Sequence, residues 1–155
     1  MLVVARRYVH NTMEAEDVVQ ESFISAFARL DQFKAQVSFG AWLKRIVINR
    51  CIDTLKSKHQ RLVALEDFHI SHVTNDNDTD WQVAPEITVE DINAEIEKLP
   101  EKYKYVVLLY LIEGYDHKEI SEILNITEVA SRTQLSRGKQ KLQNALKVKQ
   151  NEARY

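Results

Sequence analysis

Apolar residues recur at three- and four-residue spacing over residues 11–30, which is the period of an amphipathic helix. Asn11 can cap this helix, and Glu14 can complete a capping box. The stripe expected to be buried consists of Val19, Phe23, Ala26, Phe27 and Leu30. Asp17, Gln20 and Glu21 lie on a different, acidic face, which is available to solvent or to a partner.

A second amphipathic helix is predicted from Ser38, a plausible cap, to about Lys58. The residues available for burial are Phe39, Trp42, Leu43, Ile46, Val47 and Leu55. Its other side is basic and carries Lys44, Arg45, Arg50, Lys56 and Lys58, with Arg61 nearby.

The helical period disappears between Leu65 and Pro85, where an acidic stretch indicates a linker. The pattern resumes near Thr88, with an apolar face of Val89, Ile92, Ile96 and Leu99. Pro100 breaks it, and a further helix follows from Glu101 to about Glu113, ended by Gly114. We therefore expect domains at 1–61 and 88–150, joined by an acidic flexible linker at 62–87.

Two capping signals divide the last third of the chain into a short and a long helix. Asp116 with Glu119 forms a capping box that opens a helix through Leu124, and Thr127 can cap a helix that reaches about Leu146. A short helix, a tight turn and a longer helix form the helix-turn-helix arrangement. Ser121 is small enough to let the two helices approach, and the residues expected at their crossing are Ile120, Leu124, Ile126, Leu135, Gly138 and Leu142.

The longer helix has the chemistry of a DNA-contacting surface. Its first half presents Arg132, Thr133, Ser136 and Arg137, and Lys139, Lys141, Lys147 and Lys149 extend the positive charge. Residues 129–151 hold six Lys or Arg and no acidic residue, which suits contact with phosphates. The alternative is a solvated helix within a helical hairpin, because lysine-rich faces often contact only water.

Composition supports an all-α protein of two small domains. The chain has 155 residues, 45% hydrophobic and 28% charged, with only three Gly and two Pro, so it lacks the turn residues that many-stranded folds need. The net charge of −2 hides two basic segments that flank an acidic one. Residues 1–61 and 98–155 carry an excess of Lys and Arg, whereas residues 62–97 hold ten acidic residues and no basic one. This asymmetry favours nucleic acid as the partner of the basic segments.

The sequence offers little for other classes of function. It has no Gly-rich phosphate loop, nucleophile elbow or metal-ligand cluster, so we predict a protein that is not an enzyme and needs no cofactor or metal. His69 and His72 are three residues apart, but they fall in the acidic stretch without a Cys partner. Cys51 has apolar neighbours and is expected to be a small buried residue. No apolar run is long enough to span a bilayer or to act as a signal peptide, so we expect a cytoplasmic protein.

The basic helix from Ser38 is a weaker candidate for nucleic-acid contact. Arg45, Asn49 and Lys56 share one helical side at spacings of four and seven. Asn can pair with base edges, and aromatic rings such as Phe33, Phe39 and Trp42 can hold unstacked bases. On periodicity alone, these aromatic residues are more often part of a core.

The order of these motifs resembles a known family. The stretches AEDVVQESFISAFARLDQF (15–33) and FGAWLKRIVINRCIDTLKSK (39–58) resemble the promoter-melting domain, region 2, of extracytoplasmic-function (ECF) sigma factors of bacterial RNA polymerase. The stretches LPEKYKYVVLLYLIEGYDHKEISEILNI (99–126) and SRTQLSRGKQKL (131–142) resemble region 4 of the same family. Together they cover most of the chain outside the linker.

This resemblance implies a sigma factor that binds core RNA polymerase and promoter DNA, has an anti-sigma partner, and has no small-molecule substrate. The acidic face of Asp17, Gln20 and Glu21 is then the polymerase-docking face. The implied minus-ten contacts are Phe39, Trp42, Arg45, Asn49 and Lys56, on melted DNA. The implied minus-thirty-five contacts are Arg132, Thr133, Ser136, Arg137, Lys139 and Lys141, on duplex DNA.

Two departures from the family pattern are visible. The family normally has residues before the position of Met1, and Val129 with Ala130 stands where many members have Gly-Thr. Two other classes of function compete with the sigma factor. One is an ordinary helix-turn-helix regulator that binds duplex DNA without polymerase, and the other is a helical interaction protein of the anti-sigma type.

Overall fold

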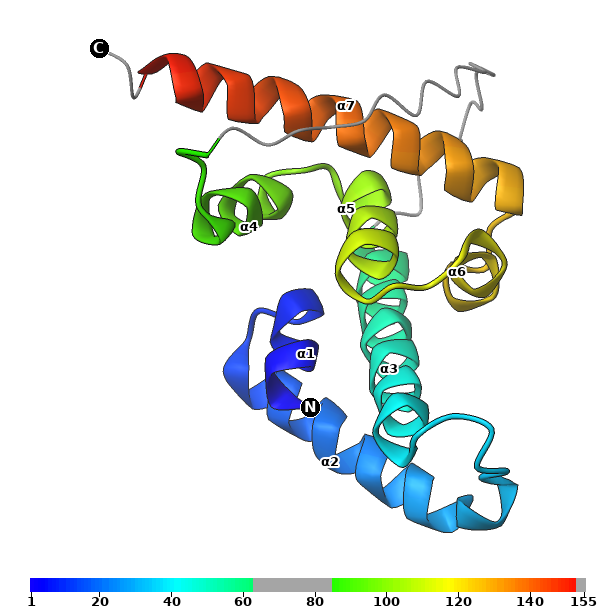
Figure 1. The fold of residues 1–155 in the computed structure, drawn as a ribbon. Coiled ribbons are helices and arrows are strands. Elements are labelled where there is room, and N and C mark those ends of the chain that lie inside the picture. The colour runs from blue at the N-terminus through cyan, green and yellow to red at the C-terminus, as the bar shows by residue number, and fades with distance from the viewer. Residues whose placement is uncertain (63–84, 153–155) are drawn as a thin grey trace. The chain divides into compact units, whose positions relative to one another are not determined.

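The computed structural model describes residues 1–62 and 85–152, and all regular elements in these ranges are helices (Figure 1). They form two compact units, which agrees with the predicted all-α class. The first unit holds α1 (Leu2–Tyr8), α2 (Thr12–Ala28), the 3-10 helix η1 (Leu30–Gln32) and α3 (Phe39–Leu62). The second holds α4 (Val89–Glu97), α5 (Glu101–Val107), the π-helix η2 (Leu108–Ile112), α6 (His117–Leu124) and α7 (Glu128–Glu152). Residues 63–84, which include most of the expected linker and both His69 and His72, lie outside the described residues.

Helix α2 begins at the predicted cap but forms only half of the predicted capping box. The side chain of Asn11 accepts a hydrogen bond of 3.2 Å from the Glu14 amide. The carboxylate of Glu14 pairs instead with Lys58 of α3. An interaction across two helices has therefore replaced the local one, and it ties the start of α2 to the end of α3.

The buried side of α2 differs from the one predicted. Ala26 is buried as predicted, but Phe27 is 63% exposed and Leu30 is 48% exposed. Ala15, Val18 and Ser22 complete the side that faces the core. Val19 and Phe23 are only half-buried. Small side chains let α2 lie close to α1 and α3, so packing selects the small face and leaves larger apolar residues outside.

Helix α3 is the central element of the first unit. Ser38 caps it as predicted, because its hydroxyl accepts a hydrogen bond of 3.2 Å from the Ala41 amide. The fully buried positions are Leu43, Val47, Ile48, Cys51 and Ile52. Of the six residues predicted to be available for burial, only Leu43 and Val47 are in this group; Phe39 is 39% exposed, and the other three are half-buried.

In the second unit, α4 starts at a reciprocal capping box between Thr88 and Asp91. Ile96 is its main buried residue, whereas Val89, which was predicted on the same apolar face, is 67% exposed. Pro100 precedes α5, as the sequence predicted, and Gly114 follows η2 with a left-handed φ of 78°. Glycine suits this stop because other residues rarely adopt that conformation.

Helix α7 runs along the second unit and crosses α5 (Figure 1). The crossing is close at Gly138, where an added Cβ would lie 2.6 Å from Cγ2 of Val107 and 3.3 Å from Cβ of Tyr103. The sequence predicts Gly138 at the crossing of the two helix-turn-helix elements, and this prediction is wrong. Gly138 packs on α5, because α7 is long enough to contact α5 and α6 with different turns of one face.

Candidate nucleic-acid interface

The helix-turn-helix forms as its capping signals predict. The Asp116 carboxylate accepts from the Glu119 amide at 2.8 Å, and the Glu119 carboxylate accepts from the Asp116 amide at 3.0 Å. Asn125 ends α6 in the left-handed conformation, with a φ of 55°. The Thr127 hydroxyl then accepts from the Ala130 amide at 3.0 Å and so caps α7. These local bonds fix the angle at which α7 leaves the turn.

One side of α7 packs in the core, and the opposite side is the candidate DNA surface. The buried side comprises Ser131, Leu135, Gly138, Leu142 and Leu146. At 3.6 residues per turn, the opposite side carries Thr133, Ser136, Gln140 and Asn144. We call these four the outward face of α7. Ser136, Gln140 and Asn144 are exposed, and Thr133 is half-buried.

The six residues predicted to contact duplex DNA do not form one continuous surface. Thr133 and Ser136 belong to the outward face. Arg132 is exposed at one edge, where it is 3.5 Å from Glu128 in an ion pair one turn apart. The remaining three are Arg137, Lys139 and Lys141. They lie at the two edges of the outward face, each near an aromatic ring of η2 or α5.

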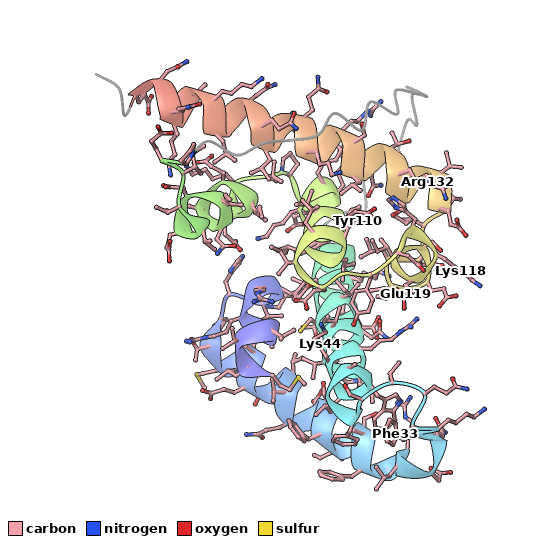
Figure 2. The ribbon with its side chains drawn as sticks, in the orientation of Figure 1. Phe33, Lys44, Tyr110, Lys118, Glu119 and Arg132 are labelled. Atoms are coloured by element: carbon pink, nitrogen blue, oxygen red, sulfur yellow. The ribbon has the colours of Figure 1, made fainter. Side chains whose placement is uncertain are left out.

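The edge of α7 beside α6 carries an aromatic and histidine cluster. The rings of Tyr110 and His117 stack at 4.9 Å, and Lys139 Nζ is 5.7 Å from the Tyr110 ring. The Nδ1 atom of His117 is 2.8 Å from the hydroxyl oxygen of the buried Ser131. Burial and the nearby Arg132 lower the pKa of His117, so its neutral form is favoured. Figure 2 labels Tyr110 and Arg132 on this side of the unit.

The basic surface of α7 is shorter than its sequence suggests. Lys149 is 2.8 Å from Asp91 and 3.7 Å from Glu95, both on α4. Hydrogen bonds from Lys149 and Thr88 lower the pKa of Asp91 to about 2. The prediction that Lys149 extends the DNA surface was therefore wrong, because acidic residues of α4 neutralise it.

Helix α3 presents its predicted contacts on the side that points away from the core. Asn49 is exposed, and Arg45 and Lys56 are half-buried on the same helical side. Two other basic residues of α3 face α2. Arg50 Nε donates to Glu21 at 2.8 Å, and Lys58 pairs with Glu14. These two residues are therefore engaged by carboxylates of α2.

Three aromatic rings gather at the start of α3. Phe33 lies 5.6 Å from Phe39 and 5.4 Å from Trp42, and Phe39 lies 5.7 Å from Trp42, between ring centroids. The sequence left a choice between core residues and a base-stacking surface. The rings pack on each other at the surface end of the helix and keep partly exposed faces. Figure 2 labels Phe33 in the segment that leads into α3.

The outer side of α2 combines acidic and apolar residues. Asp17 and Gln20 are exposed there as predicted. Glu21 is also exposed, but its carboxylate is held by Arg50. The prediction of a simply acidic face missed three large apolar residues, Met13, Ile24 and Phe27, which are 76%, 70% and 63% exposed. With Asp17 and Gln20 they form what we call the α2 stripe.

Sequence reasoning also missed two polar residues of α7. Gln140 and Asn144 continue the outward face at spacings of four residues from Ser136. Their amides can donate to and accept from base edges or phosphates. The helical period places both residues on the same face as Ser136, but they are uncharged, and the charge pattern pointed to the neighbouring lysines.

A metal or thiol site finds no support in the described part of the chain. Among residues 1–62 and 85–152, no group of three or more His, Cys, Asp or Glu could hold a metal ion. Cys51 is fully buried, and this burial raises the pKa of its thiol to about 12. As predicted, it is a core residue. None of the described helices is both long and apolar enough to cross a membrane.

Comparison with known families and proteins agrees with this geometry. Residues 2–61 match Sigma-70 region 2, and residues 90–142 match Sigma-70, region 4. The chain is 32% identical to the ECF RNA polymerase sigma factor SigW of Bacillus subtilis, over 91% of this chain and 80% of that protein. It is 28% identical to the RNA polymerase sigma-H factor of Pseudomonas aeruginosa, over 90% and 77%.

The fold also has counterparts among solved structures. The sigma factor RpoE, in a co-crystal structure with the anti-sigma factor NepR from Bartonella quintana, has a TM-score of 0.61 at 21% identity, over 95% of this chain and 89% of that chain. CnrH, in complex with the cytosolic domain of CnrY, has a TM-score of 0.53 at 22% identity, over 94% and 79%. The described helices, the two matched regions and the SigW relationship together show that the chain belongs to the ECF family of RNA polymerase sigma factors.

Proposed function

We propose that three separate surfaces of this sigma factor bind three partners. The α2 stripe binds polymerase, α3 binds melted DNA, and α7 binds duplex DNA. The family carries the general function, which is promoter-specific initiation of transcription with core RNA polymerase. The main support for assigning different forms of DNA to α3 and α7 is that the two helices differ in their side chains and in their surrounding structure. Aromatic rings and Asn49 accompany α3, whereas α7 belongs to a helix-turn-helix.

The α2 stripe has the character of a protein interface. Met13, Ile24 and Phe27 expose most of their surface on one helical side, although burying such side chains is favourable by roughly 1.5–3 kcal/mol each. Asp17 and Gln20, on the same side, add polar groups that orient a partner. A mixed apolar and polar patch of this kind marks a binding site. We assign it to core RNA polymerase.

The surface of α3 has the chemistry for unpaired bases of the minus-ten element. The Asn49 amide is exposed and can pair with a base edge. The rings of Phe33, Phe39 and Trp42 lie within 5.7 Å of one another and can stack on a base that has left the duplex. Arg45 and Lys56 flank Asn49 and can contact the backbone phosphates on either side.

The outward face of α7 has the chemistry for the minus-thirty-five element as duplex DNA. A helix-turn-helix places the first half of its second helix in the major groove. Arg132, Thr133 and Ser136 lie in that half with exposed or half-exposed side chains. Arg132 has the functional group best suited to guanine, and its weak, exposed pairing with Glu128 can be exchanged for such a contact.

An anti-sigma protein is a further expected partner. The two solved structures named above are complexes with an anti-sigma factor, NepR, and with the cytosolic domain of CnrY. A protein that covers the α2 stripe or the outward face of α7 would block initiation in the cytoplasm. Pull-down of the tagged chain from native cells should recover core polymerase and a small stoichiometric inhibitor; recovery of polymerase alone under every growth condition would contradict this assignment.

Two substitutions test the separation of docking from melting. Asp17→Arg should weaken binding to core polymerase, because it reverses a charge within the docking stripe. Asn49→Ala should leave that affinity unchanged but reduce permanganate reactivity of thymines in the melted region. The matched controls are Glu90→Arg and Asn93→Ala, exposed residues of α4 that lie outside all three surfaces. Equal loss of polymerase binding in Asp17→Arg and Asn49→Ala would overturn the separation.

A further inference from the structure

Three cations converge on one tyrosine where α5 crosses α7. Lys102 Nζ is 4.9 Å from the Tyr103 ring centroid, and Lys141 Nζ is 5.9 Å from it. Burial acts to raise the pKa of Tyr103, but hydrogen bonds from Lys102 and Arg137 outweigh it and leave the pKa lowered. Tyr103 is only 7% exposed. Its ring is therefore held in place by packing, and the cations lie around it. We call Lys102, Tyr103, Arg137 and Lys141 the tyrosine-cation cluster.

The lysines of this cluster differ from the other lysines nearby in whether a carboxylate lies close to them. Lys98, Lys104 and Lys149 each lie within ion-pair distance of a carboxylate of α4. Within the described ranges 1–62 and 85–152, no carboxylate of α4 lies within ion-pair distance of Lys102 or Lys141. Like charges held close together repel, and an anion placed among them removes that cost. Lys102 and Lys141 therefore have the electrostatics to hold an anion near the Tyr103 ring.

The cluster borders the outward face of α7. Arg137 and Lys141 are one turn apart, and each directly follows a residue of that face, Ser136 and Gln140 respectively. A recognition helix that lies in the major groove has a sugar-phosphate backbone along each side. On one side of α7 that backbone would meet the tyrosine-cation cluster, and Lys102 would reach it from α5, outside the helix-turn-helix.

We propose that Lys102, Arg137 and Lys141, held around Tyr103, bind a backbone phosphate of duplex DNA beside the outward face of α7. This inference rests on the proposed duplex-binding role of α7 and deepens it. It also moves Arg137 from base recognition, where the sequence had placed it, to backbone contact. Arg132 keeps the base-reading role, and the cluster sets affinity and register without selecting sequence.

The test uses holoenzyme reconstituted from core polymerase and the full chain, with a fluorescent duplex library of randomised sequence. Bound fraction is measured by anisotropy over a series of salt concentrations, and the bound duplexes are sequenced. The variants are Lys102→Ala, Lys102→Arg, Tyr103→Phe, Arg137→Ala and Arg132→Ala. The matched control is Lys98→Ala, which removes one exposed lysine of the same unit from outside the cluster.

Loss of the whole phosphate contact would reduce the slope of log affinity against log salt by about 0.9 and lower affinity about fivefold near physiological salt, and removal of one cation should give a part of this loss. Lys102→Ala and Arg137→Ala should show this partial loss with unchanged sequence preference. Lys102→Arg should retain affinity, because it keeps the charge. Tyr103→Phe removes only the hydroxyl that positions the cations, so it should weaken binding while keeping the slope.

Two results would overturn the proposal. One is a Lys102→Ala holoenzyme whose slope and affinity equal those of Lys98→Ala. The other is an Arg137→Ala holoenzyme that selects different sequences from the wild type, as Arg132→Ala is expected to do. Failure of the wild-type holoenzyme to enrich any sequence would instead count against the proposed function itself, so the two failures are distinguishable.

Discussion

The close crossing at Gly138 gives a prediction whose size follows from the structure. In Gly138→Ala the new methyl would lie 2.6 Å from Cγ2 of Val107, about 1 Å inside the favourable carbon-carbon separation of roughly 3.5–4.0 Å. Val107 is fully buried and β-branched, so it cannot rotate away freely. The Cβ of Tyr103, at 3.3 Å, blocks a second direction of relief.

Two opposing effects set the magnitude. Overpacking of a core costs roughly 1–3 kcal/mol, while replacing Gly by Ala within a helix contributes about 1 kcal/mol of stability. The net loss should be about 1 kcal/mol or slightly more, so the midpoint of thermal unfolding of the second unit should fall by roughly 4–8 °C. Circular dichroism measures the overall transition, and hydrogen exchange of α5 and α7 amides assigns it to this unit.

A second substitution separates steric clash from other causes. In a Val107→Ala background both γ-methyls are absent, so Gly138→Ala should be neutral or stabilising there. Gly40→Ala is the matched control, because Gly40 also lies in a helix and nothing lies within 4 Å of the position that a Cβ would take there. A Gly138→Ala protein as stable as the wild type, or equally destabilised with Val107 and with Ala at 107, would refute the packing argument.

Three further predictions concern other features. Ala35 has a left-handed φ of 53°, so Ala35→Gly should stabilise the first unit by about 0.5 kcal/mol. In a Trp81→Phe background, where fluorescence reports on Trp42, an unfolding midpoint at a lower urea concentration would contradict this. The pKa of His117 is lowered in the folded state, so its contribution to stability is complete above the unfolded pKa near 6.5 and is lost as pH falls below that value. His117→Gln should flatten the dependence of stability on pH, and equal pH profiles of the variant and the wild type would contradict this. Glu21 and Arg50 are about half exposed, so a double-mutant cycle should give a coupling below about 1 kcal/mol that shrinks with salt; a larger, salt-independent coupling would show that the pair is more than a surface interaction.

Features that depend on neighbouring residues were predictable from the sequence. The caps at Ser38, Asp116 and Thr127 bond to amides three residues away, so the pattern of residue types contains all the information needed. The same holds for the stops at Pro100 and Gly114. The starts of α3, α6 and α7 followed from these local signals, but α3 and α7 extend to Leu62 and Glu152, past their predicted ends.

Features that depend on distant residues were not predictable in this way. Glu14 leaves its capping box for Lys58, which is 44 residues away in the chain, and Lys149 is neutralised by Asp91. The core side of α2 was only partly predicted: Ala26 is buried as expected, but tight helix packing favours Ala15 and Ser22 over the larger Phe27. Charge and hydrophobicity along the chain indicate what a side chain can do, but packing decides which partner it has.

The same distinction applies to the candidate site. The family resemblance assigned nucleic-acid contacts to α3 and α7, which stays a prediction, and the structure places Asn49 and Ser136 on accessible sides of these helices. It could not show that Arg137 and Lys141 turn toward Tyr103, because that contact is made by a different helix. Residues proposed to read bases can be distinguished from residues proposed to contact the backbone only when the position of α5 is known.

The central claim is that this chain directs initiation together with core polymerase, and does not act as an autonomous DNA-binding regulator. The most direct test is in vitro transcription on a library of genomic fragments, with core polymerase, with the chain alone, and with both. The account predicts discrete start sites that share upstream and minus-ten elements only when both proteins are present, and weak, unselective duplex binding by the chain alone. Tight, sequence-selective binding by the isolated chain, without new start sites when core polymerase is added, would contradict it.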